Sequence, residues 1–185
     1  VVANAVSLIA NYDSSRTGAY VVLGGAILRG ENVANNWSAD ATGGAWWNIG
    51  TGGPTSLTLG AAGTALHYNK NLSFFSFGHG GYFSPQRYLQ GTVPLSWSIK
   101  HSRVFYEMQV SPGFQYFSTE DAPYYPIGIG PASPEAFAPL VYEGTSHKGA
   151  TYNVTARVEY RIAPHWHLGI FGAANNTRDF DSRAI

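Results

Sequence analysis

The sequence contains no cysteine, little charge and no long apolar run, and each absence excludes a class of protein. Without cysteine, the chain of 185 residues can form no disulfide framework, thiol nucleophile or cysteine-based zinc site. No stretch of about 18 or more apolar residues occurs, so no transmembrane helix is predicted. Charged residues make up only 12%, with eleven basic and eleven acidic side chains. This balance gives no electrostatic reason to expect nucleic-acid binding.

Aromatic residues and glycine are abundant instead. Aromatics account for 15% of the residues and glycine for 22 positions, a combination that is frequent in membrane β-barrels. Residues 103–118 and 151–162 alternate regularly between apolar and polar side chains, which predicts long β-strands with one apolar and one polar face. Weaker alternation predicts six more strands, giving eight in all. These six cover residues 5–12, 18–29, 37–49, 56–68, 89–100 and 166–176.

The predicted connections fall into two groups by length. Residues 14–17, 50–55, 101–102 and 163–165 form short turns, whereas residues 30–36, 69–88 and 119–150 form medium to long loops. Because antiparallel strands alternate in direction, all short turns lie at one rim and all longer loops at the other, as in an outer-membrane barrel. The strand at 37–49 also places Trp37 and Trp47 near the two ends of its apolar face, where membrane interfaces favour them.

One of the long connections is unusually aromatic and carries little charge. Ordinary surface connections of this length are polar, so this one is expected to pack against the rest of the protein. Its glycines allow backbone freedom, its proline fixes a bend, and its rings supply surface to bury. The residues are Gly78, His79, Gly80, Gly81, Tyr82, Phe83, Ser84, Pro85, Gln86, Arg87 and Tyr88.

The same region carries a family resemblance. The run Tyr-Phe-Ser-Pro-Gln-Arg-Tyr-Leu at 82–89, followed by Val-Pro-Leu-Ser-Trp at 93–97, resembles the C-terminal domain of cellulose synthase operon protein C, an outer-membrane export protein of bacterial cellulose secretion. The similarity extends through residues 1–13, 66–68 and 175–180 and the order of the strands between them. It therefore covers nearly the whole chain.

The resemblance implies an all-β, antiparallel transmembrane outer-membrane β-barrel of sixteen strands, preceded by periplasmic tetratricopeptide repeats. Residues 1–185 would form a single segment, the second half of that barrel, with about eight strands and without the family's final strand. The implied function is passive export of cellulose or a related exopolysaccharide across the bacterial outer membrane. The implied partners are the β-1,4-glucan chain, outer-membrane lipid, the rest of the barrel, the repeats and, indirectly, the inner-membrane cellulose synthase complex.

The polar strand faces supply the candidate pore-lining residues. Charged and amide side chains there can stabilise the barrel wall as a ladder of paired groups, or hydrogen-bond to sugar hydroxyls. Aromatic side chains that fall on the same faces by parity could stack against sugar rings, although a bulge at Gly43-Gly44 or Pro112-Gly113 would shift that parity. The candidates are Asp40, Trp46, Phe105, Glu107, Gln109, Gln115, Asn153, Arg157, Glu159 and Arg161. Residues 78–88 would shape or gate the extracellular mouth.

No signature of catalysis or metal binding is found, so we expect neither an enzyme nor a cofactor. A dyad of Ser84 and His79 is conceivable, but a packing role is favoured for both, and His165 and His167 lack a third ligand. Two alternatives stay open: a carbohydrate-binding or adhesive β-domain that uses Trp46, Trp47 and the long loops, and a small outer-membrane barrel enzyme.

Overall fold

The computed structural model describes residues 1–50, 53–128, 140–177 and 180–184, and those residues form β-strands, turns and loops. Twelve strands are defined among them. They are β1 (Val2–Asp13), β2 (Thr17–Gly30), β3 (Val33–Gly50), β4 (Thr55–Tyr68), β5 (Arg87–Thr92), β6 (Leu95–His101), β7 (Val104–Ser118), β8 (Ala122–Pro123), β9 (Val141–Tyr142), β10 (Ser146–Ala163), β11 (Trp166–Thr177) and β12 (Phe180–Ala184). None of the described residues forms a helix that could span a membrane.

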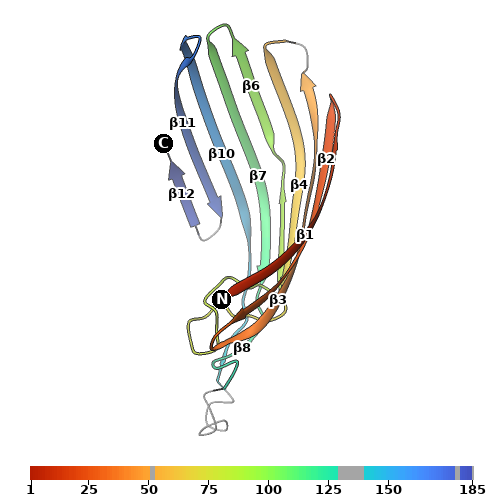
Figure 1. Ribbon diagram of the computed structural model, residues 1–185, viewed down its shortest axis with the longest axis vertical. Coiled ribbons are helices and arrows are strands. Elements are labelled where there is room, and N and C mark those ends of the chain that lie inside the picture. Colours follow the sequence, from red (N-terminus) through yellow and green to blue (C-terminus); the bar gives the residue numbers. More distant parts are fainter. Residues whose placement is uncertain (51–52, 129–139, 178–179, 185) are drawn as a thin grey trace.

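Ten of these strands form one antiparallel sheet, in the order β1-β2-β3-β4-β5-β7-β10-β11-β12. Strand β6 continues the line of β5 and pairs with the same neighbours, β4 and β7. Figure 1 shows a long, curved sheet with the short turns at its upper end and the extended loops at its lower end. The predicted all-β, antiparallel fold class is confirmed.

The predicted strand at 89–100 is interrupted at Val93-Pro94 and becomes β5 and β6. Proline has no N–H to donate to the ladder, so it favours a break in the strand. The neighbours still bond to this break, because the Val93 N–H donates to the Pro112 carbonyl and the Gly60 N–H to the Pro94 carbonyl, at 2.9 and 2.7 Å. The two halves therefore keep one position in the sheet.

The prediction of a medium-length loop at residues 30–36 is wrong. Strand β2 runs to Gly30 and β3 begins at Val33, leaving a two-residue turn in which Asn32 has a φ of 55°. Asparagine tolerates this left-handed conformation better than most residues, which suits a tight hairpin turn. Long connections are thus found at one rim only, as predicted, but that rim also holds a short turn.

Two further elements were not predicted. The connection between β7 and β10 contains the small hairpin β8-β9, and part of the predicted 119–150 loop, residues 129–139, lies outside the described residues, as do Thr51 and Gly52 of the predicted 50–55 turn. Strand β12 pairs with β11, from Thr177 opposite Phe180 to Ala173 opposite Ala184. No strand was predicted after residue 176, so β12 is an addition to the predicted eight.

The sheet has two chemically distinct faces. The apolar face exposes many large hydrophobic side chains, among them Leu23, Trp47, Met108, Val158 and Ile170, each more than 40% accessible. The opposite face, here called the polar face, carries the polar residues of the alternating strands. Buried polar side chains on it lie near the long loops: Asn36, Ser38 and Gln115 are 3%, 8% and 5% exposed. The long loops cover the end of this face next to them, whereas Arg157, further along β10, stays solvent-accessible.

Candidate functional site

The strand register brings all ten candidate pore-lining residues onto the polar face. Arg157 lies opposite Glu107, Thr155 opposite Gln109 and Gly149 opposite Gln115. Equivalent pairings extend this face across β6, β5, β4 and β3, where Asp40 lies opposite Leu66 and Trp46 opposite Gly60. The residues placed together are Asp40, Trp46, Phe105, Glu107, Gln109, Gln115, Asn153, Arg157, Glu159 and Arg161.

The parity of this face is preserved along the central part of every strand. Register shifts occur between Leu28 and Gly30, between Asn48 and Gly50, and between Arg161 and Ala163, all close to strand ends. The glycine pair Gly43-Gly44 and the Pro112-Gly113 pair stay in regular register, so the bulges suggested there are absent. The aromatic candidates therefore share the face with the charged ones.

Four of the charged candidates on the polar face, Glu107, Arg157, Glu159 and Arg161, lie on β7 and β10. Arg157 donates to the same Glu159 carboxylate oxygen through Nε, at 3.0 Å, and through a second guanidinium nitrogen. Both residues are on one strand, two positions apart, and both are solvent-accessible. Glu107 faces Arg157 from β7 in the register. An accessible ion pair of this kind contributes little to stability, and so leaves these groups available for other polar contacts.

Aromatic rings on β2 and β3 lie against glycines of the neighbouring strand. A side chain at Gly18 would collide with the ring of Trp46, so the indole occupies the space over this glycine. Tyr20 lies beside Gly44, where a Cβ would be 2.8 Å from its ring, and the rings of Tyr20 and Trp46 have centroids 6.4 Å apart and planes tilted by 40°. Aromatic rings on a polar face offer the apolar planes on which sugar C–H groups pack. The sequence signal would have been a glycine paired with each aromatic residue.

At the long-loop end, the segment 69–86, here called the covering segment, folds over the polar face. One side chain that anchors it on the sheet is Asn36 of β3, which is 3% exposed. The Asn36 amide donates to the Lys70 carbonyl at 2.9 Å and to the Tyr82 hydroxyl oxygen at 3.0 Å, and its own oxygen accepts from the Lys70 N–H at 3.0 Å. One strand side chain thus ties both ends of the covering segment to the sheet.

The interior of the covering segment is closed by polar contacts around Ser84, which is fully buried. Its hydroxyl oxygen accepts from the Leu72 N–H at 2.7 Å and lies 3.1 Å from the Ser73 hydroxyl. Gln86, 4% exposed, donates to the Ser84 carbonyl at 3.0 Å and accepts from the Glu120 N–H at 2.8 Å. The motif Ser84-Pro85-Gln86 is therefore a packing core that links the covering segment to the next long connection.

His79 joins the covering segment to the β8-β9 hairpin. Its Nε2 lies 2.9 Å from the Pro123 carbonyl oxygen, and its ring packs edge-on against Phe74 and Tyr142. Phe74 and Tyr142 stack with centroids 3.7 Å apart, and Tyr124 stacks on the other side of Tyr142 at 4.1 Å. Ser84 and His79 have separate partners, consistent with packing. Groups of three or more potential metal ligands are absent from the part of the chain that the structure describes.

Burial also affects the ionisation of the covering segment. It raises the pKa of the Tyr82 phenol above the ordinary value, while the hydrogen bond from Asn36 lowers that pKa and the neighbouring Tyr68 raises it further. The net shift is upward, so the phenol stays neutral at physiological pH. The oxygen of the neutral phenol can accept the hydrogen bond that the Asn36 amide donates.

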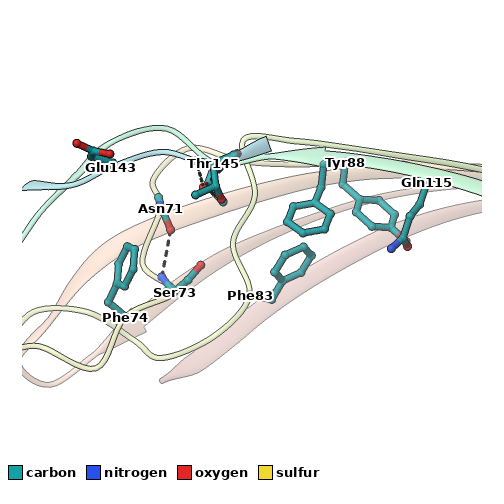
Figure 2. A pocket seen from close by; sticks show the side chains of 10 residues that line it. Asn71, Ser73, Phe74, Phe83, Tyr88, Gln115, Glu143 and Thr145 are labelled. Atoms are coloured by element: carbon teal, nitrogen blue, oxygen red, sulfur yellow. Dashed lines mark hydrogen bonds between the residues drawn. The ribbon is translucent and has the colours of Figure 1, made fainter. Parts of the chain in front are cut away.

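A cavity of about 580 Å³ lies between the covering segment and the polar face. Figure 2 shows Phe83 beneath Tyr88, with Gln115 further along the sheet and Phe74, Asn71 and Glu143 toward the loop end. Phe83 packs edge-on against Phe117 at 5.2 Å and Tyr88 at 6.3 Å. The cavity combines ring faces with amide, hydroxyl and carboxylate groups, the mixture that binds sugars. Three of the residues that line the cavity were among the predicted site residues: Phe83, Tyr88 and Gln115.

The other important residues of this site were missed by sequence reasoning. Asn36 falls in a stretch predicted as a loop, and Asn71, Tyr124 and Tyr142 belong to long connections without periodicity. Nothing local distinguishes them, because their partners are 34 to 49 positions away in the cases of Asn36 and Asn71. An asparagine preceding an alternating strand was the one available signal.

Comparison with known proteins identifies the family of this chain. The family model for the C-terminus of cellulose synthase operon protein C matches residues 1–185. Proteins named cellulose synthase operon protein C are 35% identical over 98% of this chain in Xanthomonas axonopodis pv. citri, 32% over 92% in Pseudomonas fluorescens and 30% over 96% in Escherichia coli K12. The chain spans only 13 to 16% of the length of these relatives. It belongs to the family defined by the C-terminus of cellulose synthase operon protein C.

Proposed function

We propose that the chain forms part of an outer-membrane β-barrel channel that conducts cellulose or a closely related exopolysaccharide out of the cell. The observation that carries this proposal is the inverted character of the sheet. Its apolar face is exposed along the strands, while the long loops fold over one end of the polar face. A soluble sandwich would bury its apolar face against a second sheet, whereas a barrel in lipid exposes that face and keeps polar residues inside.

The dimensions of the strands support a membrane location. Strands β3 and β10 have 18 residues each and β7 has 15, which corresponds to roughly 50 to 60 Å at about 3.3 Å per residue. This exceeds the apolar band of about 25 Å in outer-membrane barrels even when the strands are tilted. Exposed aromatic residues on the apolar face lie toward both ends of the strands, as expected for two membrane interfaces. Tyr12, Trp47, Tyr106, Tyr160 and Trp166 lie near the short turns, and Trp37 and Phe114 lie toward the long loops.

The two outer strands support a role as one part of a larger barrel. In the described part of the chain, β1 pairs only with β2 and β12 only with β11, so both outer strands have a free edge. Strands beyond this segment in a longer protein could pair with these edges. About sixteen strands enclose an aqueous channel, whereas about eight leave an interior filled by side chains. The proposed partners are therefore the remaining strands, outer-membrane lipid and tetratricopeptide repeats on the periplasmic side.

The substrate proposal combines the family with the polar face. The relatives are named for the cellulose synthase operon, and a β-1,4-glucan offers hydroxyls at its ring edges and C–H groups on its ring faces. Asp40, Glu107, Gln109 and Asn153 can hydrogen-bond to hydroxyls, and Trp46 and Phe105 can stack on rings. Conduction would be passive, with the inner-membrane cellulose synthase complex supplying the chain. The proposal includes no catalytic residue, cofactor or metal.

Within this channel, the covering segment would act as an extracellular gate. Residues 78–88 contain the predicted gate, and their contacts with Asn36 and Phe117 hold them over the polar face. The test is to delete residues 76–88 from the intact protein and to measure extracellular cellulose and uptake of a large solute. Increased leakage supports the gate, and unchanged leakage together with unchanged export contradicts it. A protein that stays monodisperse without detergent would contradict the barrel itself.

A further inference from the structure

A second cavity, of about 300 Å³, lies at the opposite end of the polar face beside the short turns. It is formed by β6, β7, β10 and β11 and has no contact with the covering segment. Its lining includes the aromatic ring of Phe105 and four basic side chains, Lys100, Arg103, Arg161 and His167. The cavity is large enough for about one sugar unit, so it can form a local binding site.

The register explains why these groups converge. Phe105 lies opposite Lys100 of β6 on one side and opposite Glu159 of β10 on the other. Arg161 lies opposite His167 of β11. Gly169 faces Glu159 without a side chain of its own, and a Cβ there would lie 3.0 Å from the glutamate Cγ. Glu159 can therefore occupy the space over Gly169, leaving the Phe105 ring between Lys100 and the β10 charges.

The charges in this cavity do not balance. Glu159 is the acidic lining residue, and its carboxylate is bonded to Arg157. Lys100, Arg103 and Arg161 form no ion pair within the described residues. Arg161 donates to the Ser102 carbonyl at 3.2 Å and holds its guanidinium at the cavity. The cavity therefore presents surplus positive charge together with an aromatic ring.

We propose that this cavity binds an acidic sugar unit of an exopolysaccharide, with Phe105 stacking on the ring and Lys100 and Arg161 binding a carboxylate. Arginine and lysine supply charge-assisted hydrogen bonds to such an anion, and a ring of basic groups favours anions in a channel. A neutral glucan would use the stacking contact but would leave the positive charge unmatched. This inference rests on the proposed channel function, because it requires the polar face to meet the polymer.

The test compares two probes that differ only in charge. Intact protein in detergent is titrated at low salt with cellotetraose and with cellotetraose oxidised to carboxylates at C6. We expect about tenfold tighter binding of the carboxylated probe, because a hydrogen bond to a charged group contributes on that scale. The preference should fall at high salt. Equal affinity for the two probes, or tighter binding of the neutral one, overturns the proposal.

Substitutions then locate the site. The double variant Lys100→Gln, Arg161→Gln should lose the preference, while Arg29→Gln, which removes a cation from the apolar face, should keep it. Phe105→Leu should weaken the binding of both probes. If the double variant still prefers the carboxylated probe, the binding site lies elsewhere and the assignment is overturned. Cellulose export and channel conductance are measured on the same variants: if both persist without any preference for the acidic probe, this inference fails while the proposed function stands.

Discussion

The side-chain amide of Asn36 in β3 donates a 3.0 Å hydrogen bond to the phenol oxygen of Tyr82 in the covering segment. The two residues are 46 positions apart in sequence, and Asn36 also bonds to both the N–H and the carbonyl of Lys70. A single buried amide therefore holds the start and the end of the covering segment on the polar face. This makes it the most direct way to test whether that segment controls passage.

Replacing either partner should loosen the covering segment to a different degree. We call the position of the covering segment seen here, over the polar face, its closed position. Tyr82→Phe removes one hydrogen bond and should destabilise this closed position by about 0.5 to 1.5 kcal/mol. Asn36→Ala leaves several groups without partners and should destabilise it by about 1 to 3 kcal/mol. Single-channel recordings of the intact protein should show a higher open probability for Asn36→Ala than for Tyr82→Phe. The reverse order, or unchanged recordings for both, would contradict the anchoring role.

The raised pKa of Tyr82 predicts an alkaline response. Because its folded-state pKa lies above the ordinary 10.0, the closed position keeps its full stability below that pH. As pH rises above about 10, the phenol ionises more readily when released, and the closed position loses stability until the folded-state pKa is passed. Open probability should therefore rise in this alkaline range. The rise in open probability should be smaller in Tyr82→Phe. If the rise is identical in that variant, the ionisation of other tyrosines causes it.

Two glycines allow the effect of backbone strain to be separated from the effect of steric contact with a neighbouring loop. Gly78 and Gly128 both have positive φ, 94° and 76°, and alanine in that conformation costs roughly 1 to 2 kcal/mol. A Cβ at Gly78 would lie 3.0 Å from Pro126 and Ile127, whereas one at Gly128 would meet nothing within 4 Å. Gly78→Ala should therefore increase protease cleavage of the covering segment and channel opening more than Gly128→Ala. Equal effects would mean that the contact between the two loops is unimportant.

The sheet could be predicted from the sequence because its determinants are local. Alternation along β7 and β10 predicted their faces and the extent of β7, although β10 begins at Ser146, inside the predicted 119–150 loop. Cross-strand pairing then placed Arg157 and Glu107 together. The break between β5 and β6 could also have been predicted, since Pro94 lies inside the predicted strand. Treating that run as continuous overlooked the missing N–H of proline.

The covering of the polar face could not be predicted in the same way. Ala34, Asn36 and Ser38 are buried, at 4%, 3% and 8% exposure, because a distant segment folds over them. Their small and polar character indicates a loop or a solvent-facing strand when only neighbours are considered. The sequence could identify residues 78–88 as packed, from their aromatic content, but not the surface against which they pack. That information lies in pairs such as Asn36 and Tyr82.

Trp46 offers a test of the polar face as a path for sugars. Its ring lies over Gly18, so Trp46→Ala removes an aromatic plane without disturbing a packed core, and Trp46→Phe keeps a smaller plane. If glucan rings stack there, cellulose export should fall in Trp46→Ala and be largely retained in Trp46→Phe, because stacking depends on the presence of a ring face. Export is measured as extracellular cellulose per amount of folded protein in the outer membrane.

Gly18→Val provides the complementary change, since a side chain at position 18 would push the indole away from the sheet while leaving it in the protein. Export should then fall without any loss of aromatic content, and folded protein, checked by heat-modifiable migration in gels, should still reach the membrane. Gly63→Val is a matched control: the nearest atom to a Cβ there is a carbonyl oxygen at 3.5 Å, and no ring is displaced. If the two glycine variants export equally well, a displaced Trp46 serves as well as one that lies over Gly18, and the position of its ring does not determine passage.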